Sequence, residues 1–329
     1  MSSLAEAFIG LVGESHLLNI HWHNLKKGLG QQMVKTQTIP SERKGSQQMI
    51  VELETITWTE LDKINRSQAL VMIPLSPIEE HGPHLPLGTD IIAAADIAAQ
   101  AAARLNDEDP QRPVVLSPAL PLGCAAVTAD FPGTLSLRGS TLRAVVCDIC
   151  RAWVGHGFKN LLICNHHLDP VHMKAILSAI RAVEDESEIR IAETMSRTVY
   201  AGAENEAITR GRAMGLDMRY EIHADAKETA YIQYRRPELF RAEAAADLDP
   251  VRIDVKKGMR DGYTTFKQMG AALGYLGTPR AGDAEYGQLY LDVAVRQTVE
   301  LAMKLVNGEA LPPIHPKIEA FLDKQVKLE

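Results

Sequence analysis

The sequence predicts an α/β fold with three layers, in which helices cover both faces of a mostly parallel central sheet. From about residue 49 onward, apolar β-rich runs alternate with helical patterns, as they do in folds of this class. Polar clusters follow directly after two of the expected strands, where such sheets bind ligands. The chain of 329 residues is 46% apolar and can bury a large core. We therefore expect residues 49–329 to form a single domain.

The expected strands are short apolar runs with the length and composition of buried parallel strands. They lie at residues 69–75, 113–120, 160–165 and 189–195. The expected helices lie between these runs and carry apolar residues at helical spacing, at residues 91–105, 140–157 and 171–185. Cys147 and Cys150 form a C-x-x-C pair inside the second helical pattern. We interpret them as one apolar helix face rather than as a redox or zinc pair.

Residues 1–48 are expected to be an appendage to that domain. Residues 28–48 are polar and rich in residues that break helices or form turns. The stretch HLLNIHWHNL (16–25), in contrast, is too apolar for a free tail. We expect it to act as an arm that packs on its own core or on a neighbouring subunit.

Charge and hydropathy indicate which classes of partner the protein can bind. The net charge is −7 at pH 7 and no block is rich in Lys and Arg, so the sequence lacks the basic surface that nucleic acids require. No apolar run approaches the roughly 18 residues of a membrane span, and the N-terminus lacks the basic region of a signal peptide. Four cysteines are too few for a disulfide framework. We expect a cytoplasmic protein that acts on a small-molecule substrate, without nucleic-acid or membrane partners.

Two pairs of acidic and imidazole side chains follow expected strands. Glu79 and His81 come after the first, and His167 and Asp169 come after the third. Residues two apart in extended backbone point to the same side, so each pair can face one ligand. The alternative is that each histidine is a hydrogen-bonded structural residue, but two such pairs make a ligand set the stronger interpretation.

Asp90 follows the turn PLGTD and precedes an apolar helix, so it can be a helix N-cap, a metal ligand, or both. A set of two histidines and three carboxylates without a thiolate suits Zn²⁺ and Mn²⁺. If one carboxylate bridges, two such ions can lie about 3.5–4 Å apart and activate a shared water.

His223 lies in a further polar stretch, with Glu228 five residues on. From these residues alone, a structural role and a functional role both remain open.

Five motifs, in order, resemble the creatininase (creatinine amidohydrolase) family over about residues 49–307. They are EEHGPHLPLGTD (79–90), DFPGTLSL (130–137), CNHHLDP (164–170), HADAKET (223–229) and GYLGTPRAGDAEYG (274–287). The first is similar to the family's E-Q-H-G-P-H-L-P-L-x-T-D signature, which is long and specific. The resemblance implies a creatininase-like three-layer fold, a dinuclear site with Zn²⁺ and/or Mn²⁺, hydrolysis of C–N bonds in small and often cyclic amides, and a homo-oligomer, commonly a hexamer.

Carried over by position, the resemblance implies that Glu79 and His167 bind one metal and that His81 and Asp169 bind the other. Asp90 would bridge them. His223 matches the catalytic histidine of the family and would protonate the leaving nitrogen after a metal-activated hydroxide attacks the carbonyl carbon. Asp169 would also help to orient the attacking water.

The sequence departs from the family pattern at several positions. Ser76-Pro77 replaces Gly-Ser, Glu80 replaces Gln, His166 replaces Gly, Asp169-Pro170 replaces Glu-Asn, and Thr128 stands where many members have a histidine. Creatinine hydrolases hold tryptophans between the second metal motif and the catalytic histidine, whereas this chain has none between residues 167 and 223. This difference argues against creatinine itself as the substrate.

Three residues are expected to contact the substrate. They are Glu228, Thr128 and Arg235, the last of which can clamp an anion together with Arg236.

Three alternatives to the opening of a small cyclic amide stay open. The first is hydrolytic C–C ring opening of a cyclic diketone such as 3-dehydro-scyllo-inosose. The second is deformylation of a pyrimidine nucleotide, which needs a phosphate site. The third is a structural protein with an inactive site, which the complete set of ligand residues argues against.

Overall fold

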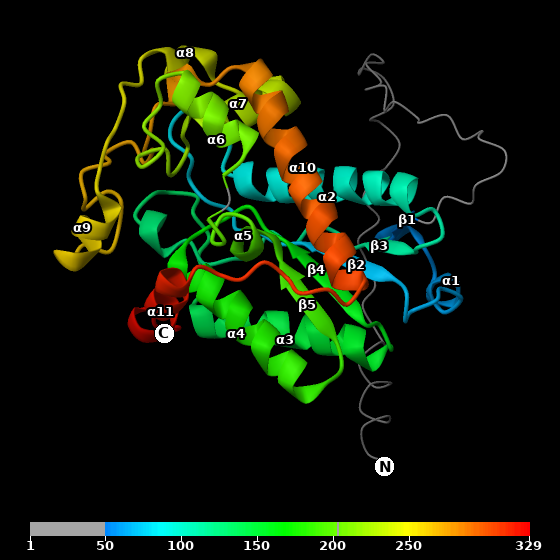
Figure 1. The fold of residues 1–329 in the computed structure, drawn as a ribbon. Coiled ribbons are helices and arrows are strands. Elements are labelled where there is room, and N and C mark those ends of the chain that lie inside the picture. The colour runs from blue at the N-terminus through cyan, green and yellow to red at the C-terminus, as the bar shows by residue number, and fades with distance from the viewer. Residues whose placement is uncertain (1–49, 203) are drawn as a thin grey trace, which may run out of the picture. The chain divides into compact units, whose positions relative to one another are not determined.

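The computed structural model describes residues 50–202 and 204–329, all within one compact unit, Ser46–Glu329. The expectations for residues 1–48 therefore lie outside the described residues. A five-stranded parallel sheet in the order β1-β3-β2-β4-β5 forms the centre of this unit (Figure 1). Its strands are β1 (Ile50–Glu52), β2 (Leu70–Pro74), β3 (Val114–Leu116), β4 (Asn160–Cys164) and β5 (Arg190–Glu193).

Four of these strands occupy the runs that the sequence predicts. β3 is shorter than its run at 113–120 because Pro118, which follows it, has no N–H to donate to a neighbouring strand. β1 was not predicted. It is a three-residue strand at one edge of the sheet, and it pairs with β3 through Ile50 opposite Val114.

The two faces of the sheet pack into separate apolar cores. Along β2, Val71 and Ile73 point into one core and Leu70 and Met72 into the other, as the two-residue period of a strand requires. The first core lies under α3 (Gly139–Gly155), α4 (Pro170–Glu186) and α11 (Pro316–Gln325). The second lies under α2 (Thr89–Glu108), α7 (Ala226–Arg235) and α10 (Ala284–Val306). This arrangement confirms the predicted three-layer α/β/α class (Figure 1).

The helices at 91–105, 140–157 and 171–185 are confirmed as α2, α3 and α4. Cys147 and Cys150 are buried and unpaired in α3, which confirms that they form one apolar helix face. The long helix α10 was not among the predicted elements. The remaining short helices are η1 (Leu53–Thr55), α1 (Trp58–Leu61), η2 (Ala126–Thr128), α5 (Thr194–Arg197), α6 (Glu206–Ala213), η3 (Pro237–Leu239), α8 (Ala242–Ala246), α9 (Val255–Arg260) and η4 (Pro279–Ala281).

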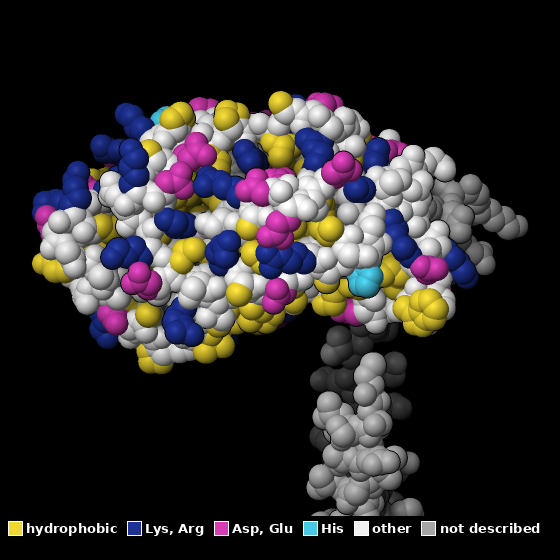
Figure 2. Space-filling model, turned by 90° about the horizontal axis from the view of Figure 1, so that it is seen from below, with side chains coloured by type: hydrophobic (Ala, Val, Ile, Leu, Met, Phe, Trp, Pro, Cys, Tyr) yellow, Lys and Arg dark blue, Asp and Glu magenta, His cyan; other side chains and the backbone are white. Residues whose placement is uncertain are grey.

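On the face shown in Figure 2, Lys and Arg side chains alternate with Asp and Glu. Ion pairs also link neighbouring helices. Arg151 of α3 contacts Glu186 of α4 at 2.8 Å, and Arg181 of α4 contacts Asp323 of α11 at 3.2 Å. Exposed pairs of this kind each stabilise a fold by about 0–1 kcal/mol, so the two cores hold the layers together. None of the helices in the described part of the chain is long and apolar enough to cross a membrane.

Candidate metal centre

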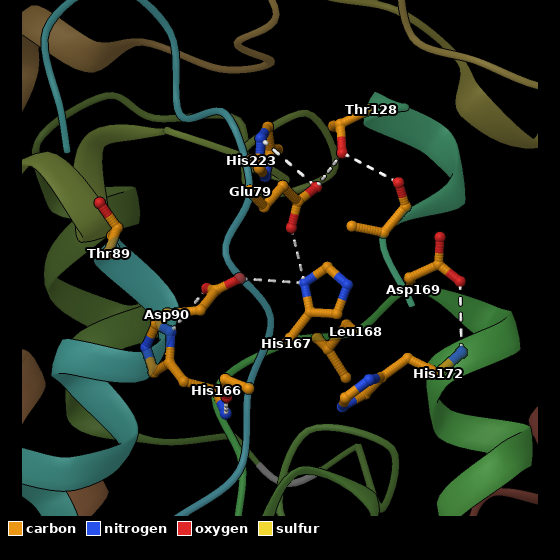
Figure 3. Close-up of polar contacts among 12 residues, drawn as sticks. Glu79, Thr89, Asp90, Thr128, His166, His167, Leu168, Asp169, His172 and His223 are labelled. Atoms are coloured by element: carbon orange, nitrogen blue, oxygen red, sulfur yellow. Dashed lines mark hydrogen bonds and ion pairs between the residues drawn. The ribbon is translucent and has the colours of Figure 1, made fainter. Parts of the chain in front are cut away.

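The buried polar residues gather at the carboxyl ends of β2 and β4, where parallel sheets bind ligands. Glu79 and His81 follow β2, and His166 and His167 follow β4. Asp90 belongs to the first turn of α2. Each of these five residues is at most 6% exposed. Figure 3 shows the carboxylates of Glu79 and Asp90 directed to the ring of His167.

A hydrogen-bonded clamp holds the two strand ends together. The Ser76 hydroxyl donates to Oδ1 of Asn165 at 3.1 Å, and the same asparagine oxygen accepts from the backbone N–H of His167 at 2.9 Å. The N–H of His166 in turn donates to Ser76 Oγ at 3.0 Å. The clamp therefore fixes the backbone that presents both histidines.

Glu79, Asp90 and His167 form the first group of ligand atoms, in which all three atoms lie within 4.8 Å of one another. His167 Nδ1 lies 2.9 Å from Glu79 Oε2 and 3.1 Å from Asp90 Oδ2. Its Nε2 lies 2.9 Å from the carbonyl oxygen of Cys124. Because a carbonyl can only accept, Nε2 carries a hydrogen, and in the neutral imidazole the Nδ1 lone pair faces the two carboxylates.

A second group forms around His81. Its Nε2 lies 3.4 Å from Asp90 Oδ1 and 3.7 Å from Glu228 Oε2. Its Nδ1 donates to the carbonyl oxygen of Glu79 at 3.0 Å, so in the neutral imidazole the Nε2 lone pair faces the carboxylates. Asp90 thus presents one oxygen to His167 and the other to His81.

Among the described residues, three buried atoms at the centre of these groups have no hydrogen-bond partner: Glu79 Oε2, His81 Nε2 and Asp90 Oδ2. Buried polar atoms are rarely left without a partner. If the imidazoles are neutral, their lone pairs face carboxylate oxygens, which is unfavourable. A divalent cation between them would satisfy the nitrogen and oxygen atoms together. The residues present therefore fit a metal.

The pKa shifts of Asp90 and His81 also indicate that the site stabilises positive charge. Burial alone would raise the pKa of Asp90, but His81, His166 and His167 hold it well below its usual range. Burial alone would lower the pKa of His81, but Asp90 and Glu228 raise it to about 9. The carboxylates thus stabilise positive charge beside them, whether it comes from imidazolium groups or from metal ions.

His223 is held by Glu80, and one of its ring nitrogens lies within 4.8 Å of ligand atoms of His81 and Glu228, so these three residues form a further possible ligand group. Its Nε2 donates to the Glu80 carbonyl oxygen at 2.8 Å and lies 3.3 Å from Glu80 Oε1. Its ring lies 4.5 Å from the ring of His81. Burial alone would lower the pKa of His223, but Glu79, Glu80 and Glu228 raise it to about 10.

The backbone after His223 is strained. Ala224, at φ 46°, is the only non-glycine residue with positive φ in the described part of the chain. Its N–H donates to Glu228 Oε2 at 2.6 Å, and this contact supports the strained turn. Strain of about 1–3 kcal/mol at such a residue persists where the surroundings enforce it, often at functional sites. Here the turn brings His223 and Glu228 to the same place.

Asp90 is not the N-cap of α2. Gly88 takes the cap position and has no side chain to offer, whereas Asp90 lies in the first helical turn, where a carboxylate favours the positive end of the helix dipole. The capping interpretation from the sequence is therefore wrong, and both Asp90 oxygens are directed to histidines.

The structure does not bring Asp169 into either group. Asp169 is the N-cap of α4, and its Oδ1 accepts from the N–H groups of Val171 and His172. Its Oδ2 accepts from the N–H groups of Ala126 and Val127 at 3.0 and 3.3 Å. Its roles as a ligand and in orienting water stay predictions, which these contacts do not favour.

The three residues expected to contact the substrate differ in their surroundings. Thr128 donates a hydrogen bond to Glu79, and Glu228 lies among the ligand atoms in the first turn of α7. Arg235 forms two contacts of 2.7 Å with Asp96 of α2, and these occupy its guanidinium group. Substrate binding by these residues stays a prediction.

Two residues of the centre were not predicted from the sequence. His166 lies 3.4 Å from Asp90 Oδ1, and Glu80 contacts His223. The only sequence signal for them was their departure from the family motif.

Comparisons with known proteins agree with the fold and with the motifs. The family model of creatininase, described as creatinine amidohydrolase, matches residues 54–302. The chain is 28% identical to the creatinine amidohydrolase of Pseudomonas putida over 120 residues, which are 35% of this chain and 44% of that protein. It is 33% identical to the mycofactocin precursor peptide peptidase of Mycobacterium tuberculosis over 107 residues, which are 32% of this chain and 41% of that protein. The matches thus span less than half of each curated relative.

Solved structures resemble this one over most of its length. A crystal structure of creatininase has a TM-score of 0.64 at 22% identity and covers 79% of this chain and 99% of its own. A structure named for its Mn form has a TM-score of 0.64 at 21% identity, with 78% and 98% covered. A variant of the Zn-Zn type has a TM-score of 0.63 at 21% identity, with 79% and 98% covered. At this identity the likeness shows the fold.

The family model spans most of the chain and includes every residue of the two ligand groups. The chain therefore belongs to the creatininase family.

Proposed function

We propose that this protein is a dinuclear metal-dependent hydrolase that cleaves a C–N bond in a small polar amide. The observation that carries the proposal is the pair of buried ligand groups that share Asp90. His167 Nδ1 lies 3.1 Å from one Asp90 oxygen, and His81 Nε2 lies 3.4 Å from the other. Family membership supports hydrolysis.

The donor atoms suit Zn²⁺ or Mn²⁺, because they are imidazole nitrogens and carboxylate oxygens without a thiolate. Structures of relatives are named for Mn and for a Zn-Zn type. In this chain, Glu79, Asp90 and His167 would hold one ion, and His81, Asp90 and Glu228 would hold the other. Two such ions supply Lewis acidity and lower the pKa of a bound water.

His223 is the residue best placed to move a proton. The hydrogen bond from its Nε2 to the Glu80 carbonyl fixes the ring, and Nδ1 remains to accept or release a proton. General acid catalysis requires such a group beside the reacting atoms, because an amine nitrogen leaves readily only when it is protonated.

The names of two curated relatives favour a C–N bond as the target. One is an amidohydrolase and the other a peptidase, and both names describe hydrolysis of such bonds. C–C ring opening of a cyclic diketone remains the alternative reaction. We also propose a homo-oligomer, with a hexamer as the first state to test.

A substrate screen tests the proposed reaction. Full-length protein loaded with Zn²⁺ or Mn²⁺ is incubated with cyclic amides, imides, short peptides and polyhydroxy-cyclohexanones. We expect metal-dependent release of a carboxylate and an amine from at least one amide, and no release by an Asp90→Ala control. Turnover of a cyclohexanone alone would overturn the C–N assignment in favour of C–C cleavage. A failure of the intact protein to retain any metal would overturn the hydrolase proposal itself.

A further inference from the structure

His166 is a buried imidazole that the two ligand groups do not use. Its side chain is 3% exposed. Nδ1 lies 3.4 Å from Asp90 Oδ1, and Nε2 lies 2.7 Å from the hydroxyl oxygen of Tyr290 in α10. Figure 3 shows its ring beside the Asp90 carboxylate, on the other side from His167.

His166 also belongs to a group of possible ligands. One ligand atom from each of Asp90, His166 and Glu228 lies within 4.8 Å of the others. Asp90 and Glu228 are the two carboxylates that His81 Nε2 faces, at 3.4 and 3.7 Å. His166 and His81 therefore approach the same pair of carboxylates.

The distances agree with ligands around one ion. With Zn–N and Zn–O bonds of about 2.0–2.1 Å, two ligand atoms of a tetrahedral site lie about 3.3–3.4 Å apart. Asp90 Oδ1 lies 3.4 Å from His81 Nε2 and also 3.4 Å from His166 Nδ1. For a hydrogen bond, in contrast, 3.4 Å is long.

The Tyr290 hydroxyl can accept a hydrogen bond from Nε2 of His166, the ring nitrogen that does not face Asp90. Metal-bound histidines commonly donate their second N–H to an oxygen atom, which fixes the tautomer. If His166 donates from Nε2 to the Tyr290 hydroxyl, its Nδ1 keeps a lone pair that faces Asp90. His167 has the same arrangement, with the Cys124 carbonyl as the acceptor.

From this geometry we infer that His166 Nδ1 is an additional ligand of the ion held by His81, Asp90 and Glu228. The inference rests on the proposed dinuclear centre. It gives this ion four protein ligands, the number that closed, structural zinc sites have. The ion held by Glu79, Asp90 and His167 would have three protein ligands, as catalytic zinc sites do, which keep a fourth position for water or substrate.

The two ions would therefore have different roles. The open position would belong to the ion beside Glu79, whose Oε1 lies 3.9 Å from Nε2 of His223, the proposed proton carrier. The four-ligand ion should bind more tightly and act mainly as a fixed charge.

Proton NMR of the full chain loaded with two equivalents of Co²⁺ tests the inference. Each coordinated imidazole gives one exchangeable, strongly shifted N–H resonance, and competition with a chelator measures the affinity of each ion. In His166→Gln we expect one resonance to disappear and one of the two ions to bind at least about tenfold more weakly. His172→Gln is the matched control. It changes another buried imidazole, whose ring lies 5.0 Å from that of His167 but which belongs to no ligand group among the described residues.

Tyr290→Phe provides a second test that does not alter the ligand. The resonance that His166→Gln removes should remain in Tyr290→Phe but exchange faster with solvent, because its hydrogen-bond acceptor is gone. If His166→Gln keeps every resonance and both affinities, His166 only hydrogen-bonds to Asp90 and the inference is overturned, while the dinuclear centre stands. If the unaltered protein binds no Co²⁺, the proposed function fails as well.

Discussion

Thr128 donates a hydrogen bond of 2.7 Å from its hydroxyl to Oε1 of Glu79, and both residues are completely buried. The contact directs the other carboxylate oxygen, Oε2, to His167 Nδ1. Thr128→Val keeps the shape of the side chain but removes the donor. We expect the ion at Glu79 to bind about 10–100-fold more weakly, because hydrogen bonds of this kind orient ligands.

Chelator competition measures this effect, and Thr128→Ser, which restores the hydroxyl, should recover most of the affinity. An unchanged affinity in Thr128→Val would show that Glu79 is held by other contacts.

His223 should affect the rate without affecting the metal content. If it carries the proton to the leaving group, His223→Ala lowers turnover by about 10²–10⁴-fold while both ions remain bound. His167→Ala should lower metal content and activity together, because Nδ1 faces both Glu79 and Asp90. Elemental analysis beside steady-state rates compares the two variants. Loss of an ion from His223→Ala would make His223 a ligand instead.

Asp169 should contribute to stability through its four backbone hydrogen bonds. Asp169→Ala removes the N-cap of α4 and leaves the N–H groups of Ala126 and Val127 without their acceptor. We expect a loss of about 1–3 kcal/mol in the free energy of unfolding, measured by denaturant titration, with the metal content unchanged. A variant of normal stability that lacks one ion would instead support the ligand role that the sequence suggests.

His84 should make stability depend on pH. Burial, followed by the nearby His81 and His223, lowers the pKa of His84 from 6.5 to about 4. Its Nε2 contacts the Thr229 hydroxyl at 2.8 Å. Between these two pH values the unfolded chain binds a proton that the folded protein excludes. Stability from this group is therefore complete above about pH 6.5 and is lost as the pH falls towards 4.

The His84 effect amounts to about 3 kcal/mol between pH 7 and pH 4. Denaturant unfolding of metal-free protein, compared with His84→Gln at each pH, isolates it. Parallel pH profiles for the two proteins would contradict a neutral, buried His84.

The central strands were predictable because burial on both faces leaves an unbroken apolar run. Such a run covers 69–75 and contains β2. β1 has only three half-buried or exposed residues, too few to show a pattern. The helix α10 was missed although Leu291, Val295 and Val299 repeat at helical spacing on its buried face.

The centre was only partly predictable, because spacing along the chain does not give distances between distant segments. Glu79 and Asp90 share one motif, but Glu228 reaches them from about 140 residues away, through the strained turn at Ala224. Asp169 illustrates the opposite difficulty, because it resembles a ligand in the sequence but has other contacts in the structure. A carboxylate after a strand looks the same in sequence whether it binds a metal or caps the next helix, and in this structure the four N–H groups around it decide its contacts.

The shared position of Asp90 is most directly tested by counting metal ions per chain in reconstituted full-length protein and in Asp90→Ala. Its two oxygens face His167 at 3.1 Å and His81 at 3.4 Å, so one side chain would serve both ions of the proposed centre. We expect about two Zn²⁺ or Mn²⁺ per chain in the unaltered protein, and weakened binding of both in a folded Asp90→Ala variant. An intact fold that retains no metal after reconstitution, or an Asp90→Ala variant that still binds two ions tightly, would contradict a dinuclear centre built around this residue.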